Sequence, residues 1–150
     1  MVDAKGNMRV VILTPYKRLL DLSGVTELYL PIEHGNIGVL PGHAPMVSAL
    51  GTGVVTYAQN NIFGFFKVAG GVAEITGASV SLLVDVGEDA SQIDLERAKK
   101  SLERAEGRLS ATTSEHINIK RAEESRLRAL ARIEATELHM GKISQDKKSV

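Results

Sequence analysis

Hydrophobic and polar positions follow different periods in the two parts of the chain. Up to about residue 87 the apolar residues gather in short runs, and in residues 79–86 valine and leucine alternate with polar residues. A period of two is that of a half-buried β-strand, because successive side chains point to opposite faces of a sheet. The first part of the chain is therefore predicted to consist of β-strands.

Six runs in this part have the β-branched and aromatic residues typical of strands. They are residues 8–14, 25–32, 53–58, 63–69, 71–76 and 79–86. The segments QNN (59–61) and AGG (69–71) indicate turns between strands. Many short strands at this spacing favour a β-sandwich or barrel.

The second part of the chain has a helical period. Its first apolar seam has spacings of three and four residues and consists of Leu95, Ala98, Leu102, Ala105 and Leu109. A second seam, interrupted by Arg126 and broadened by three apolar neighbours, consists of Ile119, Ala122, Ala129 and Ile133. The short connection, residues 110–116, predicts an antiparallel two-helix hairpin.

Helix starts and domain limits follow from the same pattern. Ser91, followed three residues later by Asp94, fits a capping box, and Ser114 is a cap for the second helix. Aromatic residues and prolines are absent after residue 87. We therefore expect a β-domain over residues 1–87, a mobile helical hairpin over 88–140 and a flexible tail over 141–150.

The amino-acid composition excludes several kinds of function. The chain has 150 residues, with 18 Lys and Arg against 18 Asp and Glu, and this zero net charge argues against nucleic-acid binding. The absence of cysteine excludes disulfides and thiolate metal sites. Neither a signal-peptide pattern nor an apolar run approaching the roughly 18 residues of a membrane span is present. We expect a soluble protein that is not exported.

The sequence offers little for catalysis. Phosphate-binding loops, HExxH and GxSxG are absent, and the four histidines lack metal-ligand spacing. A pairing of His34 with Glu33 stays open, although neighbours in a strand point to opposite faces. We therefore predict no catalytic residue and no metal ligand.

Two stretches are candidates for binding. Residues 34–50 combine glycines and prolines, which indicates either a structural double turn or a rigid loop displayed to a partner. Arg97, Arg104 and Arg108 share one stripe of the first helix with Asp94. That stripe is either a solvated surface or a site for an anion such as a nucleotide phosphate, to which arginine binds well.

Four segments in this order carry a resemblance to a known family: VVILTPYKRLLDL, GNIGVLPGHAPMVSAL, VAGGVAEI and IDLERAKKSLERAEGRL. The chain resembles the epsilon subunit of the bacterial F-type ATP synthase over about residues 8 to 138. The resemblance implies a ten-stranded β-sandwich followed by two helices. It also implies a non-catalytic subunit of a rotary proton-translocating complex that requires no cofactor.

The resemblance also implies partners and a place. The chain would lie on the central stalk beside the gamma subunit, contact the c-ring and reach the alpha and beta subunits when its helices extend. It would be peripheral to the cytoplasmic face of the bacterial inner membrane, held there only through the complex. The residues implied to face the c-ring are Gly35, Asn36, Gly38, Gly42, His43 and Pro45. Asn36 departs from the acidic residue that many relatives carry, which weakens a charge-paired contact there.

In the family the hairpin is a mobile inhibitor of ATP hydrolysis, inactive when folded on the sandwich and inhibitory when extended. The basic residues implied to contact the catalytic subunits are Lys120, Arg121, Arg126, Arg128 and Arg132. Some members also bind ATP as a regulatory ligand on the folded hairpin. The matching positions here are Glu88, Ile93, Asp94, Arg97, Ala98, Arg104, Arg128 and Arg132. In that role the arginines would hold phosphates, and the two acids would accept from adenine or ribose.

Two alternatives from other classes remain at this point. A free-standing β-sandwich binding module with a helical dimerisation tail would sediment as a dimer, because coiled-coil seams usually engage partner helices. A small hydrolase using His43 would show turnover by the isolated chain, but it lacks a visible nucleophile and base.

Overall fold

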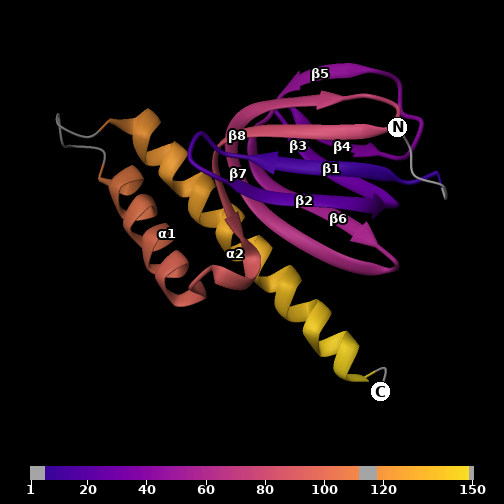
Figure 1. The fold of residues 1–150 in the computed structure, drawn as a ribbon. Helices are drawn as coiled ribbons and strands as arrows, with labels where there is room; N and C mark the ends of the chain where they lie inside the picture. The colour runs from indigo at the N-terminus through magenta and orange to yellow at the C-terminus, as the bar shows by residue number, and fades with distance from the viewer. Residues whose placement is uncertain (1–5, 112–117, 149–150) are drawn as a thin grey trace.

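A computed structural model describes residues 6–111 and 118–148, with side chains to Lys142. Eight strands come first: β1 (Met8–Leu13), β2 (Arg18–Val25), β3 (Glu27–Ile32), β4 (Gly35–Val39), β5 (Met46–Ala49), β6 (Thr52–Gln59), β7 (Ile62–Ile75) and β8 (Ser79–Asp89). A short 3-10 helix, η1 (Ala90–Gln92), leads to α1 (Leu95–Ser110) and α2 (Ile119–Lys148). Figure 1 shows the strands in one body, with both helices on one side of it. The predicted order, a β-sandwich followed by a helical hairpin, is confirmed.

Two layers of strands result from the pairing. One layer runs β5–β7–β8–β1–β2 and uses residues 72–75 of β7 and 79–83 of β8. The other runs β4–β3–β6–β7–β8 and uses residues 62–69 of β7 and the end of β8. Because β7 and β8 belong to both layers, eight continuous strands supply ten strand segments.

The bend in β7 corrects one prediction. Residues 69–71 are not a turn between two strands, since pairing with β8 continues in one register from Ala69–Val86 to Gly71–Val84. Gly70 and Gly71 have φ angles of 73° and 123°, which side chains disfavour. These glycines bend a single strand so that it passes from one layer to the other.

Three strands were missed in the sequence. β4 and β5 lie inside residues 34–50, which we interpreted as turns or a displayed loop. β4 contains two glycines and one buried side chain, and β2 has one buried side chain, at its last residue, so neither shows a clear alternation. The predicted turn at 59–61 is confirmed, because Asn60 and Asn61 have positive φ angles and join β6 to β7 in a tight hairpin.

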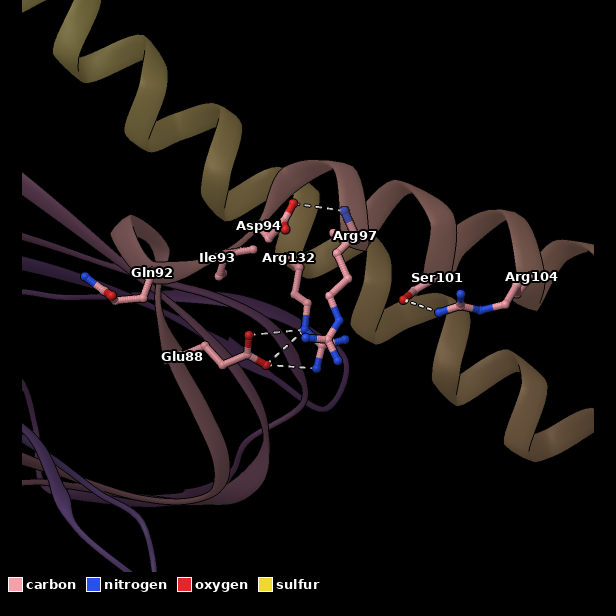
Figure 2. Close-up of a pocket in the computed structure, with 9 residues that line it drawn as sticks. Glu88, Gln92, Ile93, Asp94, Arg97, Ser101, Arg104 and Arg132 are labelled. Carbon is pink, nitrogen blue, oxygen red and sulfur yellow. Dashed lines mark hydrogen bonds and ion pairs between the residues drawn. The ribbon is translucent and has the colours of Figure 1, made fainter.

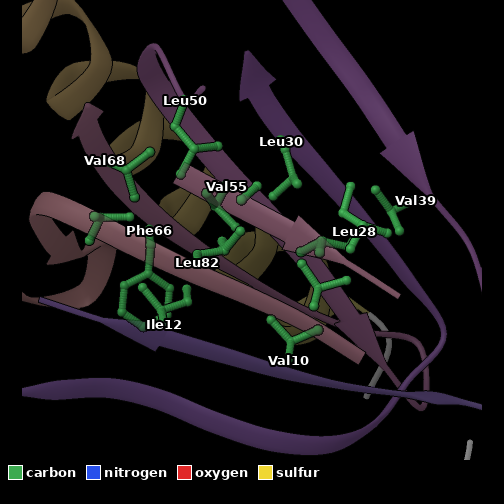
Figure 3. Close-up of a cluster of buried hydrophobic side chains, with 14 of the residues drawn as sticks. Val10, Ile12, Leu28, Leu30, Val39, Leu50, Val55, Phe66, Val68 and Leu82 are labelled. Atoms are coloured by element: carbon green, nitrogen blue, oxygen red, sulfur yellow. The ribbon is translucent and has the colours of Figure 1, made fainter. Parts of the chain in front are cut away.

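Inward-facing side chains of both layers form the main core (Figure 3). Its largest fully buried members include Met8, Ile12, Leu28, Leu30, Ile75 and Leu82. Phe66 stacks at an angle against Tyr57, with 6.1 Å between ring centroids. The alternation predicted for 79–86 places Val80, Leu82 and Val84 in this core.

The first helix begins differently from the prediction. Asp94, not Ser91, is the N-cap of α1, and its side chain accepts a hydrogen bond from the Arg97 backbone N–H at 3.1 Å. Ser91 lies in η1, where Asp89 accepts from its N–H and hydroxyl. The short carboxylate of Asp94 suits the cap position itself.

The second helix is longer than the pattern predicted. Asn118 Oδ1 accepts from the Arg121 N–H at 3.1 Å, which is a capping contact. Ser114, the predicted cap, lies outside the described residues. The helix continues through residues 141–148, past the predicted end of the hairpin. That segment has no proline, and the single Gly141 weakens a helix by only about 1 kcal/mol.

The two helices pack through small residues. Ala98 and Ala105 of α1 and Ala122 and Ala129 of α2 are buried, as the predicted seams require. Figure 1 shows α2 lying between α1 and the strands and running opposite to α1. The joint between α2 and the β-domain is a small separate cluster made of Phe65, Ala90 and Ala135, with Val54 and Ile93 packed against it.

Replacement of Gly71 by alanine tests the bend in β7. A Cβ there would overlap the Leu83 backbone carbonyl, and φ is 123°. We expect Gly71→Ala to lower the free energy of unfolding by about 3 kcal/mol. The matched control is Gly77→Ala, where a Cβ meets nothing within 4 Å. Equal urea midpoints for the two variants would contradict the bend.

Candidate anion-binding pocket between the hairpin and the β-domain

A pocket of about 400 Å³ lies where α1, α2 and the end of β8 come together. Figure 2 shows the side chains that line it. They are Glu88, Gln92, Ile93, Asp94, Arg97, Ala98, Ser101, Arg104 and Arg132. The pocket is therefore bounded by both helices and by the β-domain.

The α1 wall is set by the helix start. With Asp94 fixed as the cap, Arg97, Ser101 and Arg104 fall on one face at helical spacing. Arg104 Nη2 donates to Ser101 Oγ at 3.0 Å. In Figure 2 the Arg97 side chain points toward Glu88 and Arg132. Among the described residues its guanidinium has no carboxylate within ion-pair distance.

The opposite wall is an ion pair between the two domains. Arg132 of α2 donates to Glu88 of β8 through Nε, at 2.9 and 3.2 Å to the two carboxylate oxygens, and its Nη2 lies 2.8 Å from Oε1. This forked geometry is the strong form of a charge-assisted contact. About 30% of each side chain remains exposed, at 29% for Arg132 and 31% for Glu88.

A buried lysine lies beneath this pair. The Lys67 side chain is 0% exposed, and its Nζ lies 3.3 Å from Glu88 Oε1. Lys67 and Glu88 are direct cross-strand partners of β7 and β8. An unpaired buried ammonium would be unstable. Glu88 is thus shared between Lys67 below it and Arg132 above it.

The neighbouring charges shift the pKa of Glu88 and of the buried Lys67. Burial by itself would raise the pKa of Glu88, but the hydrogen bond from Arg132 and the charges of Lys67 and Arg132 outweigh it and lower that pKa. Burial and the repulsion of Arg132 lower the pKa of Lys67, against the attraction of Glu88. Arg128 adds to this repulsion. The pocket lining itself has three arginines, Arg97, Arg104 and Arg132, against the two acids Glu88 and Asp94, so positive charge is in excess there.

Most of the predicted nucleotide-site residues are brought together here. Seven line the pocket: Glu88, Ile93, Asp94, Arg97, Ala98, Arg104 and Arg132. Arg128 does not line it, and its Nη2 donates to Ser125 Oγ at 3.0 Å. The sequence did not indicate Gln92, Ser101 or Lys67. For Lys67, its place at the centre of an apolar strand, FGFFKVA, was the one available signal.

Comparison with known families covers both domains. Residues 7–90 match the family model described as the ATP synthase delta/epsilon chain β-sandwich domain, and residues 91–137 match its long α-helix domain. The chain belongs to the ATP synthase delta/epsilon chain family. The resemblance drawn from its sequence segments is confirmed.

Individual relatives agree with the family. An ATP synthase epsilon chain from Geobacter sp. (strain M21) is 39% identical over 111 residues, which are 74% of this chain and 80% of that protein. The epsilon chain of Solibacter usitatus is 39% identical over 99 residues, 66% of this chain and 73% of that protein. These relatives are chains of an ATP synthase, so this chain is an accessory subunit rather than an enzyme by itself.

Solved structures share the fold. A chain in the Euglena gracilis mitochondrial ATP synthase OSCP/F1/c-ring structure superposes with a TM-score of 0.73 at 22% identity, covering 90% of this chain and 82% of that one. A chain in the Tetrahymena thermophila mitochondrial ATP synthase central stalk/c-ring structure gives 0.56 at 14% identity, covering 86% and 96%.

The residues that the family resemblance assigned to the c-ring contact lie along β4 and in the turn that follows it. Gly35 and Asn36 begin β4 and line a cleft that also contains Leu127 of α2. Gly38 lies further along β4, opposite Tyr29. Gly42, His43 and Pro45 follow the other end of β4, where the Gly42 N–H donates to the Gly77 carbonyl at 2.9 Å.

The basic residues assigned to inhibition also have different surroundings in the folded hairpin. Arg126 lies 3.9 Å from Glu106 of α1 and 3.1 Å from Glu123. Arg132 is paired with Glu88, whereas Lys120 and Arg121 are exposed near the start of α2. Extension of the helices would therefore have to break the pairs of Arg126 and Arg132 with α1 and β8.

Replacement of Arg132 by glutamine tests the interdomain pair. We expect Arg132→Gln to lower the free energy of unfolding by about 1 to 2 kcal/mol at pH 7. This value is at the low end for hydrogen bonds between charged groups, because both side chains are partly exposed. The folded pKa of Glu88 is depressed, so this stability is present above its unfolded pKa and is lost as pH falls through the folded value.

The difference from wild type should therefore shrink below about pH 4 in urea titrations, as the carboxylate protonates. Arg121→Gln, an exposed charge on the same helix, is the control and should behave as wild type. A loss of the same size at pH 7 and pH 3 would show that the Arg132 carbon chain, not its charge, stabilises the fold.

Proposed function

We propose that the chain is a central-stalk subunit of a rotary, proton-translocating bacterial F-type ATP synthase. It couples the c-ring to the gamma subunit at the cytoplasmic face of the inner membrane, and its hairpin inhibits ATP hydrolysis under the control of ATP. The family match and the bacterial epsilon chains support the stalk assignment. The observation that supports control by ATP is the pocket of excess positive charge shared by α1, α2 and β8.

The hairpin is suited to movement because its joint with the β-domain is small. Three residues form the buried cluster there, and two of them are alanines. Burial of such small side chains contributes little hydrophobic free energy. Two packings of the hairpin that differ by a few kcal/mol are therefore accessible, as an inhibitory switch requires.

A ligand that touches all three elements would favour the docked hairpin. Arg97 lies on α1, Arg132 on α2 and Glu88 on β8, so extension of the helices dismantles the pocket. ATP bound there stabilises the docked state by the ratio of its affinities for the two states. Low ATP would release the hairpin. Lys120, Arg121, Arg126, Arg128 and Arg132 would then be available to acidic groups of the alpha and beta subunits.

Calorimetric titration of the isolated chain with ATP tests the ligand. We expect binding by wild type and at least about tenfold weaker binding by Arg97→Gln, since one phosphate-binding fork is lost. Arg108→Gln is the matched control, because Arg108 lies on the same helix but does not line the pocket. Equal affinities for both variants would contradict a phosphate site on Arg97.

Hydrolysis by the assembled synthase tests the control of inhibition. With wild-type subunit, we expect stronger inhibition at low ATP than at high ATP. With Arg97→Gln the inhibition should persist to higher ATP concentrations, because the ligand no longer holds the hairpin down. Arg108→Gln should follow wild type. An identical dependence on ATP for all three forms would remove the sensor role and leave the stalk role standing.

A further inference from the structure

Glu88 occupies the position on Arg132 that a phosphate would take. Its two oxygens accept from Nε and Nη2 of one guanidinium, at 2.8 to 3.2 Å. A phosphate presents paired oxygens to the same fork with similar geometry. Two anions cannot share this face of Arg132, because like charges at such short range repel strongly.

Glu88 has a second cationic partner, Lys67, which takes no part in binding the ligand. Lys67 lies on β7 directly across from Glu88, is completely buried and contacts Oε1 at 3.3 Å. It does not line the pocket. If Arg132 turns to another anion, Glu88 therefore remains paired and the buried ammonium remains compensated. Arg97, already pointing toward Arg132, supplies a second cation for the incoming anion.

We propose that Glu88 is a built-in competitor of the ligand's phosphate for Arg132, and that Lys67 is the residue that receives Glu88 when the ligand binds. This inference rests on the proposed function, since it concerns the affinity of the same pocket. It gives Glu88 a further role beside the expected one of accepting from adenine or ribose. Without ligand, the Glu88 carboxylate takes the place of the phosphate and holds α2 on the β-domain.

The consequence is that a higher ligand concentration is needed to occupy the pocket than would be needed without Glu88. Each ligand anion has to displace a carboxylate that is already fixed in place, so only the difference between the two contacts contributes to affinity. The same carboxylate keeps the docked hairpin populated when the pocket is empty. The ligand therefore binds a docked state that exists beforehand rather than creating that state.

The test uses inorganic tripolyphosphate as the probe, because it has phosphates but no base or sugar with which Glu88 could form a favourable contact. The full chain is titrated by calorimetry at low ionic strength. We expect Glu88→Gln to bind tripolyphosphate about tenfold more tightly than wild type, since one repulsive charge is removed and the Arg132 fork is freed. Glu74→Gln, which removes the same charge on an exposed part of β7, should bind as wild type.

A double variant separates release of Arg132 from a simple change in charge. Lys67→Met with Glu88→Gln keeps the net charge of wild type and avoids leaving an unpaired buried lysine. We expect it to retain tighter binding than wild type. Unchanged or weaker binding in both the single and the double variant, with cooperative urea unfolding preserved, would overturn the proposal.

ATP titrations of the same proteins keep the two proposals distinct. If wild type binds no ATP but Glu88→Gln and the double variant gain tripolyphosphate binding, the competitor stands and the nucleotide-sensor role fails. If wild type binds ATP and both variants bind tripolyphosphate no better than wild type, the sensor stands and the competitor is overturned.

Discussion

The antiparallel pairing of β7 with β8, from Phe66–Asp89 to Ile75–Val80, runs through both layers of the sandwich and determines most of what surrounds it. The two strands close the core on their inner faces. On the outer face beneath α2, the same register places Lys67 directly beside Glu88. A change of register by one residue would place Lys67 and Glu88 on opposite faces of the sheet, with one of the two charges in the apolar core. The pairing of the two strands therefore fixes Glu88, the strand residue of the pocket lining, beside Lys67.

A charged contact at a domain joint has a different effect from an apolar one. A large hydrophobic joint would hold α2 permanently, whereas the cluster around Phe65 is small. It is accompanied by polar contacts, which are the Glu88–Arg132 pair and the hydrogen bond from Lys142 Nζ to the Phe63 carbonyl. Charged partners exchange one anion for another at low net cost, because both states keep the cation satisfied. In the proposed exchange, a soluble anion would therefore remodel this joint while the β-domain stays folded.

The overall architecture could be predicted from the sequence better than the individual short strands and turns. Periods of two and of 3.6 residues identified the long strands and both helices, because burial repeats along them. β4 and β5 were missed since their few inward residues are separated by Gly35, Gly38 and the proline turns. The break expected at 69–71 was wrong because glycine also permits a bent strand. The IDLERA segment indicated the α1 side of the pocket, where neighbours are close in sequence.

The part of the site that the sequence did not indicate depends on distant pairing. Glu88 and Arg132 are 44 positions apart, and Lys67 is 21 positions from Glu88. Family resemblance supplied Glu88 and Arg132 as site residues, but not their contact with each other. Lys67 lacked a local signal for burial under a helix, because a lysine in a strand is ordinarily expected at the surface.

The parallel pairing of β1 with β8 affects the order in which the chain folds as it is made. Arg9 pairs with Ser79, 70 positions later, and β1 lies between β2 and β8 in its layer. β1 leaves the ribosome well before β8, so the layer that contains β1 is complete only after β8 has been synthesised. Long-range pairings of this kind form slowly, because the loop must close before contacts stabilise it. The helices are synthesised afterwards and dock on a surface that β7 and β8 have only just completed.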